Sequence, residues 1–152
     1  MKKQPFLHSF RYAVQGVRTA LREERNLRFH VCAAFYVYLF SLFYEFTRVE
    51  YCLITIMVGG VMALELVNSS LERAVERPVP ERYMTAGAVK DMAAGAVLVF
   101  SIASAVCGVL LFWDTAAFAR MWRFFLRWPA LALVLAATLV PVFRFIFGKK
   151  GE

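Results

Sequence analysis

The stretch YCLITIMVGGVMALELVNSSLERAVE, residues 51–76, begins as a run of apolar side chains and ends as a polar segment. Its first part suits a membrane span, which needs ~20 mostly apolar residues. Glu65 and Asn68 nevertheless appear before the apolar run has ended, and Glu72 and Glu76 follow them. Polar and ionisable residues inside a span raise the free energy of the folded protein in the membrane. Residues of this kind are therefore candidates for a functional site. The stretch therefore predicts a membrane helix that carries such a site at its end.

These four polar residues are spaced three, four and four positions apart, which places them on one face of a helix. Glu65 and Glu72 are then about two turns apart, or ~10 Å along the axis. The polar stripe should run from inside the membrane into the water beside it.

The composition of the whole chain agrees with a membrane protein. It has 152 residues, of which 61% are hydrophobic, above the roughly 45–50% of soluble domains. Its mean hydropathy is +0.58. The net charge of +7 comes from basic residues that flank apolar segments. That placement favours orientation in a membrane, with contact to anionic headgroups, over nucleic acid as a partner.

The hydropathy pattern predicts an all-α integral membrane protein. An amphipathic surface helix is expected over 7–28, because apolar residues recur there every three or four positions. Three core spans are expected at about 29–47, 49–71 and 92–113, which completes a core of residues 1–113. Residues 114–152 should add an interfacial segment and a fourth C-terminal span at about 128–147.

The basic residues predict the orientation of these spans. Of the 18 lysines and arginines, all but Arg48, Arg120, Arg123 and Arg127 lie in the two terminal segments or in the loop over 72–91. The positive-inside rule then places both termini and this loop in the cytoplasm.

Two further polar clusters should meet the stripe on that side. Glu23 and Glu24 end the surface helix, and Lys90 and Asp91 stand where the chain re-enters the membrane. Magnesium takes one or two carboxylates together with phosphate oxygens, and a lysine adds a point charge for phosphate. The chain has no G-x-x-x-x-G-K-[ST] loop, so side chains and Mg²⁺ would have to hold the phosphates.

The motifs carry a resemblance to a known family. ELVNSSLE (65–72) followed by AVKDMAAGAVL (88–98) resembles the prokaryotic diacylglycerol kinase family of small membrane-embedded lipid kinases, over about residues 9–112. ERNLRFH (24–30) resembles the signature of its undecaprenol kinase branch. The resemblance implies a surface helix with three spans, assembled as a homotrimer. The fourth span lies outside it.

The resemblance also implies roles for individual residues. Glu65 matches the catalytic base at the lipid hydroxyl, and Glu24 and Glu72 match the carboxylates that hold Mg²⁺ on ATP. Glu76 replaces the usual aspartate of the family. The remaining residues expected near the nucleotide are Tyr12, Asn68, Glu81, Arg82, Tyr83, Lys90 and Asp91.

The expected function is transfer of the ATP γ-phosphate to undecaprenol on the cytoplasmic face of the bacterial inner membrane. Diacylglycerol phosphorylation, which makes phosphatidic acid, is the alternative within the family. A small multidrug transporter, also built on a membrane glutamate, and a structural membrane subunit are the alternatives outside it. Neither of these two needs the Lys90–Asp91 pair.

Overall fold

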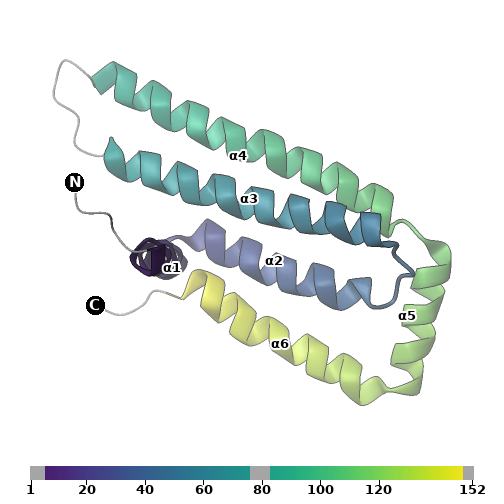
Figure 1. Ribbon diagram of the computed structural model, residues 1–152. Helices are drawn as coiled ribbons and strands as arrows, with labels where there is room; N and C mark the ends of the chain where they lie inside the picture. The colour runs from purple at the N-terminus through teal and green to yellow at the C-terminus, as the bar shows by residue number, and fades with distance from the viewer. Residues whose placement is uncertain (1–5, 76–82, 149–152) are drawn as a thin grey trace.

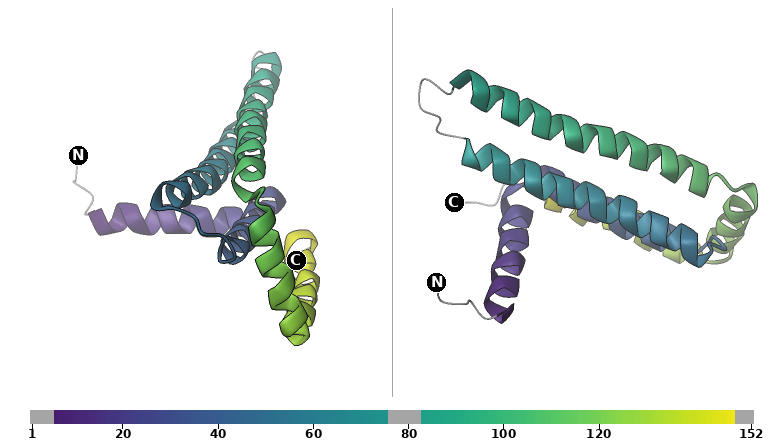
Figure 2. Two further views of the ribbon diagram at one scale, coloured as in Figure 1. Left: turned by 90° about the vertical axis from the view of Figure 1, so that its right-hand side faces the viewer. Right: turned by 45° about the horizontal axis from the view of Figure 1, so that its top comes forward.

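A computed structural model describes residues 6–75 and 83–148, and these residues form helices without any strand. Four of the helices lie side by side along one direction, in the order α4, α3, α2, α6 (Figure 1). Helix α5 runs across one end of this row, and α1 projects away from the row at the opposite end (Figures 1 and 2). The elements are α1 (Phe6–Glu23), α2 (Arg25–Ser41), α3 (Arg48–Ala74), α4 (Tyr83–Phe112), α5 (Thr115–Arg127) and α6 (Pro129–Phe147).

Three of the described helices are long and apolar enough to cross a membrane: α3, residues Thr85–Phe112 of α4, and α6. The predicted all-α membrane fold is thereby confirmed, and its C-terminal span coincides with α6. The first predicted span corresponds to α2, whose 17 residues lie at the lower end of the ~17–25 that a span needs. Its crossing of the membrane stays a prediction.

Several predicted boundaries were wrong. The surface helix ends at Glu23 rather than at residue 28, because Glu24 has extended backbone angles (φ −94°, ψ 116°) and α2 begins at Arg25. α2 ends at Ser41 rather than near 47. The span predicted at about 92–113 lies within the longer helix α4, which begins at Tyr83, since a helix satisfies its own backbone and continues in water beyond an apolar segment.

The start of α3 follows from its local sequence. Thr47 precedes the helix, and its hydroxyl accepts a hydrogen bond from the backbone N–H of Glu50, at 3.3 Å. The Glu50 carboxylate accepts in return from the backbone N–H of Thr47, at 2.7 Å. This capping box satisfies two backbone donors that the first turn leaves without partners.

One glycine of α3 lies in close contact with an aromatic ring of α4. A Cβ atom added to Gly60 would overlap the ring of Phe100 on α4, whereas one added to Gly59 would meet no atom within 4 Å. Further along the same contact, Ser104 Oγ lies 3.5 Å from Met57 Sδ. Of the two adjacent glycines in α3, Gly60 lies against α4 and Gly59 faces open space.

The C-terminal segment packs against α2, on the side away from α3 (Figure 1). The hydroxyls of Tyr36 on α2 and Thr138 on α6 share a hydrogen bond of 2.8 Å. In α5, the Arg120 Nε donates to the backbone carbonyl of Phe43, at 2.9 Å. The extension is therefore joined to the core at both its interfacial helix and its span.

We expect Gly60→Ala to destabilise the protein by ~1–3 kcal/mol, the usual cost of overpacking. Gly59→Ala is the matched control, because it makes the same change one residue away in open space. It should leave the free energy of unfolding unchanged or raise it, since alanine favours helix by up to ~1 kcal/mol. Reversible unfolding in mixed detergent micelles measures both, and equal effects of the two substitutions would contradict the packing described here.

Candidate active site

The polar stripe lies on α3, as the sequence predicts, and its two residues deepest in the membrane are buried. Glu65 is 3% exposed and Asn68 is 8% exposed. The Asn68 Nδ2 donates a hydrogen bond of 2.9 Å to Glu72 Oε1 one turn further along. The other end of the amide, Asn68 Oδ1, is buried and has no hydrogen-bond partner in the described part of the chain. The stripe thus contains a preorganised carboxylate and a buried acceptor that is ready for a ligand.

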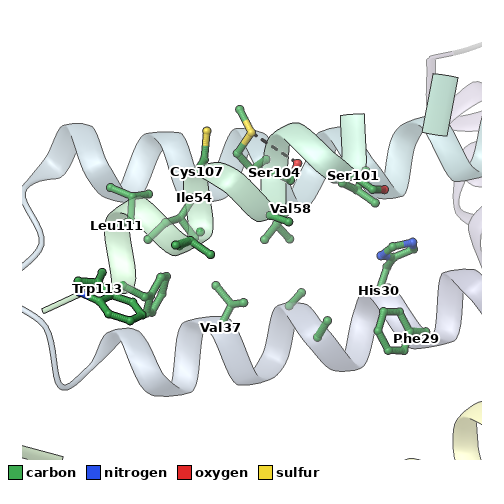
Figure 3. A pocket seen from close by; sticks show the side chains of 18 of the residues that line it. Phe29, His30, Val37, Ile54, Val58, Ser101, Ser104, Cys107, Leu111 and Trp113 are labelled. Carbon is green, nitrogen blue, oxygen red and sulfur yellow. Dashed lines mark hydrogen bonds between the residues drawn. The ribbon is translucent and has the colours of Figure 1, made fainter. Parts of the chain in front are cut away.

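His30 of α2 is the electrostatic neighbour of Glu65. In the sequence, His30 was noted only as the last residue of the ERNLRFH motif and was not predicted to be part of the site. Its electrostatic proximity to Glu65 could not be read from the chain, because the two residues belong to different helices. His30 is half-buried at one end of an apolar groove (Figure 3).

Arg73 joins the α1–α2 junction to the end of α3. Its Nη2 lies 2.8 Å from Glu23 Oε2 and 2.8 Å from Glu24 Oε1. The contact brings Glu24 to the turn of α3 that carries Glu72, the residue before Arg73. The sequence treated Arg73 only as a signal of orientation, so this role was missed. The signal in the sequence that could have indicated this role is the position of Arg73 directly after Glu72.

The acidic and basic residues of α4 lie at the same depth as the stripe. Gly60 faces Phe100 across the antiparallel pair of α3 and α4. Ser70 on α3 lies ten residues from Gly60, and Lys90 on α4 lies ten residues from Phe100, both toward the loop that joins the two helices. Lys90 is half-buried, and Asp91 beside it is exposed. The predicted meeting of the two clusters at one membrane depth is consistent with this register.

The described structure does not place the remaining predicted nucleotide-binding residues next to the polar stripe. Tyr12 is 60% exposed on α1, which projects away from the row of helices (Figure 2). Glu76, Glu81 and Arg82 lie outside the described residues, and of Tyr83 only its position as the first residue of α4 is described.

The described residues contain no group of three or more His, Cys, Asp or Glu side chains that could hold a metal ion. Magnesium bound to a nucleotide needs fewer protein ligands, since phosphates and water complete its shell. The carboxylates of Glu24 and Glu72 and the unpartnered Asn68 Oδ1 are the hard oxygen donors that this ion prefers. These residues fit Mg²⁺, and Glu24 would then have to share its carboxylate between the ion and Arg73.

An apolar groove of about 640 Å³ lies between α2, α3 and α4. Phe29 and His30 stand at one end of it and Trp113 at the other (Figure 3). Val61, one turn before Glu65, also lines it, so the groove reaches the buried end of the polar stripe. Phe118 of α5 lines it as well, which means that the C-terminal segment helps to form it.

A buried carboxylate beside an apolar groove is the kind of site expected in a membrane enzyme that works on lipid. The family model for prokaryotic diacylglycerol kinase matches residues 11–112. The chain belongs to this family, which confirms the resemblance seen in its motifs. It is a multi-pass membrane protein of a family of lipid kinases.

Named relatives agree with this assignment. Undecaprenol kinase of Bacillus subtilis is 37% identical over 107 residues, which are 70% of this chain and 87% of that protein. Diacylglycerol kinase of Haemophilus influenzae is 33% identical over 107 residues, 70% of this chain and 91% of that protein. Diacylglycerol kinase of Escherichia coli K12 is 28% identical over 103 residues, 68% and 84% of the two chains. None of the solved structures matches this chain.

The Arg73–Glu24 ion pair makes a direct prediction. Because both side chains are partly exposed, a double-mutant cycle of Glu24→Gln and Arg73→Gln should give a coupling energy of only ~0.2–1 kcal/mol. The measurement is unfolding in detergent for the wild type, both single variants and the double variant. Arg22→Gln, which removes the same charge one residue before Glu23, should show no coupling to Glu24→Gln. A coupling to Arg22 as large as that to Arg73 would contradict the geometry.

Proposed function

We propose that this protein transfers the γ-phosphate of ATP to undecaprenol and so makes undecaprenyl phosphate. The observation that carries the proposal is the position of Glu65, buried on α3 where the apolar groove meets the polar stripe. A lipid alcohol with its chain in the groove would present its hydroxyl at this depth. No nucleotide phosphate needs to enter the membrane for the two substrates to meet.

The proposed mechanism is a direct in-line transfer, in which catalysis consists mainly of positioning and charge stabilisation. Glu65 accepts the proton of the lipid hydroxyl as the oxygen attacks the γ-phosphorus. Asn68, Lys90 and Asp91 lie beside the phosphates, with Tyr12, Glu81, Arg82 and Tyr83 toward the rest of the nucleotide. Glu24 and Glu72 would hold Mg²⁺, which neutralises phosphate charge when it is bound.

The proposal includes the location of the site and the assembly. The concentration of basic residues in the terminal segments and the loop over 72–91 supports a cytoplasmic active site in the bacterial inner membrane. The family resemblance supports a homotrimer.

Undecaprenol is favoured over diacylglycerol for two reasons. The relative named undecaprenol kinase is 37% identical to this chain, against 33% for a relative named diacylglycerol kinase. The groove is also lined almost wholly by apolar side chains along its length, which suits an isoprenoid chain without ester groups. Diacylglycerol is the second candidate, because the other relatives carry that name.

The test uses purified protein with Mg²⁺, ATP, and either undecaprenol or diacylglycerol. Undecaprenol should be phosphorylated with the higher kcat/KM. Faster turnover of diacylglycerol would reverse the choice of substrate, and ATP turnover that no lipid alcohol stimulates would overturn the proposed function.

Glu65→Gln tests the proposed base. It should lower lipid phosphorylation by ~10²–10⁴-fold, the usual loss when a general base is removed. Affinity for a non-hydrolysable ATP analogue should stay nearly unchanged, because Glu65 lies two turns deeper than Glu72. Glutamine keeps the size of the side chain and removes a buried charge, so the fold should tolerate it. A variant that keeps more than about a tenth of wild-type turnover would exclude Glu65 as the base.

Val58→Trp tests the groove as the site of the lipid chain. Val58 lines the groove from α3 (Figure 3), so the larger ring should obstruct it. We expect the KM for undecaprenol to rise about tenfold or more, which corresponds to ~1.4 kcal/mol of lost binding, with the KM for ATP unchanged. Leu53→Trp is the control, since Leu53 is exposed on the same helix and is not part of the groove lining. Similar effects of the two substitutions would place the lipid chain elsewhere.

A further inference from the structure

Arg28 is a buried cation that the mechanism above does not use. The residue is 8% exposed, and its Nε is buried without a hydrogen-bond partner in the described part of the chain. None of the ion pairs found among the described residues includes it. A mostly buried cationic side chain with an unpartnered nitrogen is costly, and buried charges in proteins are as a rule paired with an opposite charge. Arg28 therefore points to an anionic ligand.

The register of α2 and α3 shows which layer of the site Arg28 occupies. These helices are antiparallel neighbours, and Glu24 meets Arg73 at their shared end (Figure 1). Four residues further into the membrane from each are Arg28 on α2 and Ser69 on α3. Ser69 is buried, as is Asn68 next to it. The layer of Arg28 is therefore the layer of Asn68.

Among the described residues, this layer contains two polar atoms that have no hydrogen-bond partner and are of complementary kind. Arg28 Nε is a buried donor, and Asn68 Oδ1 is a buried acceptor. On one side lie Glu24 and Glu72, the proposed holders of magnesium and nucleotide. On the other side lie Glu65 and His30, at the proposed depth of the lipid hydroxyl. A phosphoryl group that moves from nucleotide to lipid must pass through the layer between them.

We propose that Arg28 binds the phosphoryl group during its transfer, an inference that rests on the proposed lipid kinase function. In this step the bond between the γ-phosphorus and the β–γ bridging oxygen of ATP breaks, and ADP leaves with the electron pair. The lipid oxygen forms the new bond to phosphorus, and Glu65 takes the hydroxyl proton. Arg28 stays protonated and donates to the equatorial phosphoryl oxygens, where the planar guanidinium can form two parallel hydrogen bonds.

A phosphate could reach Arg28 from a second source, the headgroups of the bilayer. Arginines near helix ends commonly extend toward headgroups. The side chain of Arg28 is, however, buried within the protein. Arg25, one turn earlier, is exposed, and its guanidinium lies 5.7 Å from the centre of the Phe147 ring. Arg25 is thus a matched control, a cation one turn away on the same helix that does not occupy the buried layer.

The experiment compares Arg28→Met with Arg25→Met in detergent that contains no anionic phospholipid. Arg28→Met should lower kcat for undecaprenol phosphorylation ~10²–10³-fold, as expected for the loss of one transition-state donor, with the KM for ATP within about threefold of wild type. Arg28→Lys keeps the charge without the planar fork and should recover part of the activity. Arg25→Met should remain near the wild-type rate. Wild-type turnover in both Arg28 variants would overturn the inference.

Two measurements separate this role from a structural one. Without ligands, Arg28→Met should unfold at the same or a higher temperature than wild type, because it removes an unpartnered buried charge. Addition of MgADP with orthovanadate, a mimic of the phosphoryl group in transfer, should raise the unfolding temperature of wild type and of Arg25→Met, and not that of Arg28→Met. A lower unfolding temperature together with an intact vanadate shift would make Arg28 structural and overturn the inference.

The same assay distinguishes the two sources of phosphate and the two proposals. If loss of activity in Arg28→Met appears only after anionic phospholipid is added, Arg28 binds headgroups and the inference is wrong. If wild-type protein phosphorylates no lipid alcohol, the proposed function fails. If the wild-type protein phosphorylates lipid and the Arg28 variants do so at the same rate, the inference alone fails.

Discussion

The carboxylate of Glu65 lies on α3 among apolar residues and is almost wholly shielded from solvent. Such a group is tolerated only where its surroundings supply charge, hydrogen bonds or a substrate. Here the surroundings are His30 on the facing helix, the polar stripe that continues toward the loop, and an apolar groove. The packing of α2 and α4 against α3 therefore creates the environment in which this carboxylate can exist.

The break at Glu24 is the second feature on which the site depends. A continuous helix through this residue would carry α1 straight into α2 and place the acidic pair on its surface. The extended conformation instead turns the chain, so that α1 projects away from the row (Figure 2). Arg73 then links the junction to α3 through two contacts of 2.8 Å. Since exposed ion pairs contribute little stability, we regard this contact as one that orients Glu24 more than one that stabilises the fold.

The C-terminal segment is the part of this chain that the family pattern does not cover, since the match ends at residue 112. It is nevertheless integrated into the core. α6 packs along α2 through the Tyr36–Thr138 hydrogen bond, and α5 contributes Phe118 to the groove. By covering one side of α2, it fixes the helix that carries His30 and Arg28. The extension can thus influence the site without supplying any of the proposed reacting groups.

Local sequence was sufficient to predict the helices, the stripe of Glu65, Asn68 and Glu72, and their order in depth. These features depend on hydropathy and on the 3.6-residue period, which act within one element. The same information failed at Glu24, where the apolar period continues across a turn that no proline or glycine marks. Only the tertiary structure decided that His30 lies within electrostatic range of Glu65 and that Arg73 contacts Glu24. It also decided the burial of Arg28 and the shape of the groove. Each depends on the register between helices that are distant in the chain, and register is set by side-chain packing such as that of Gly60 against Phe100.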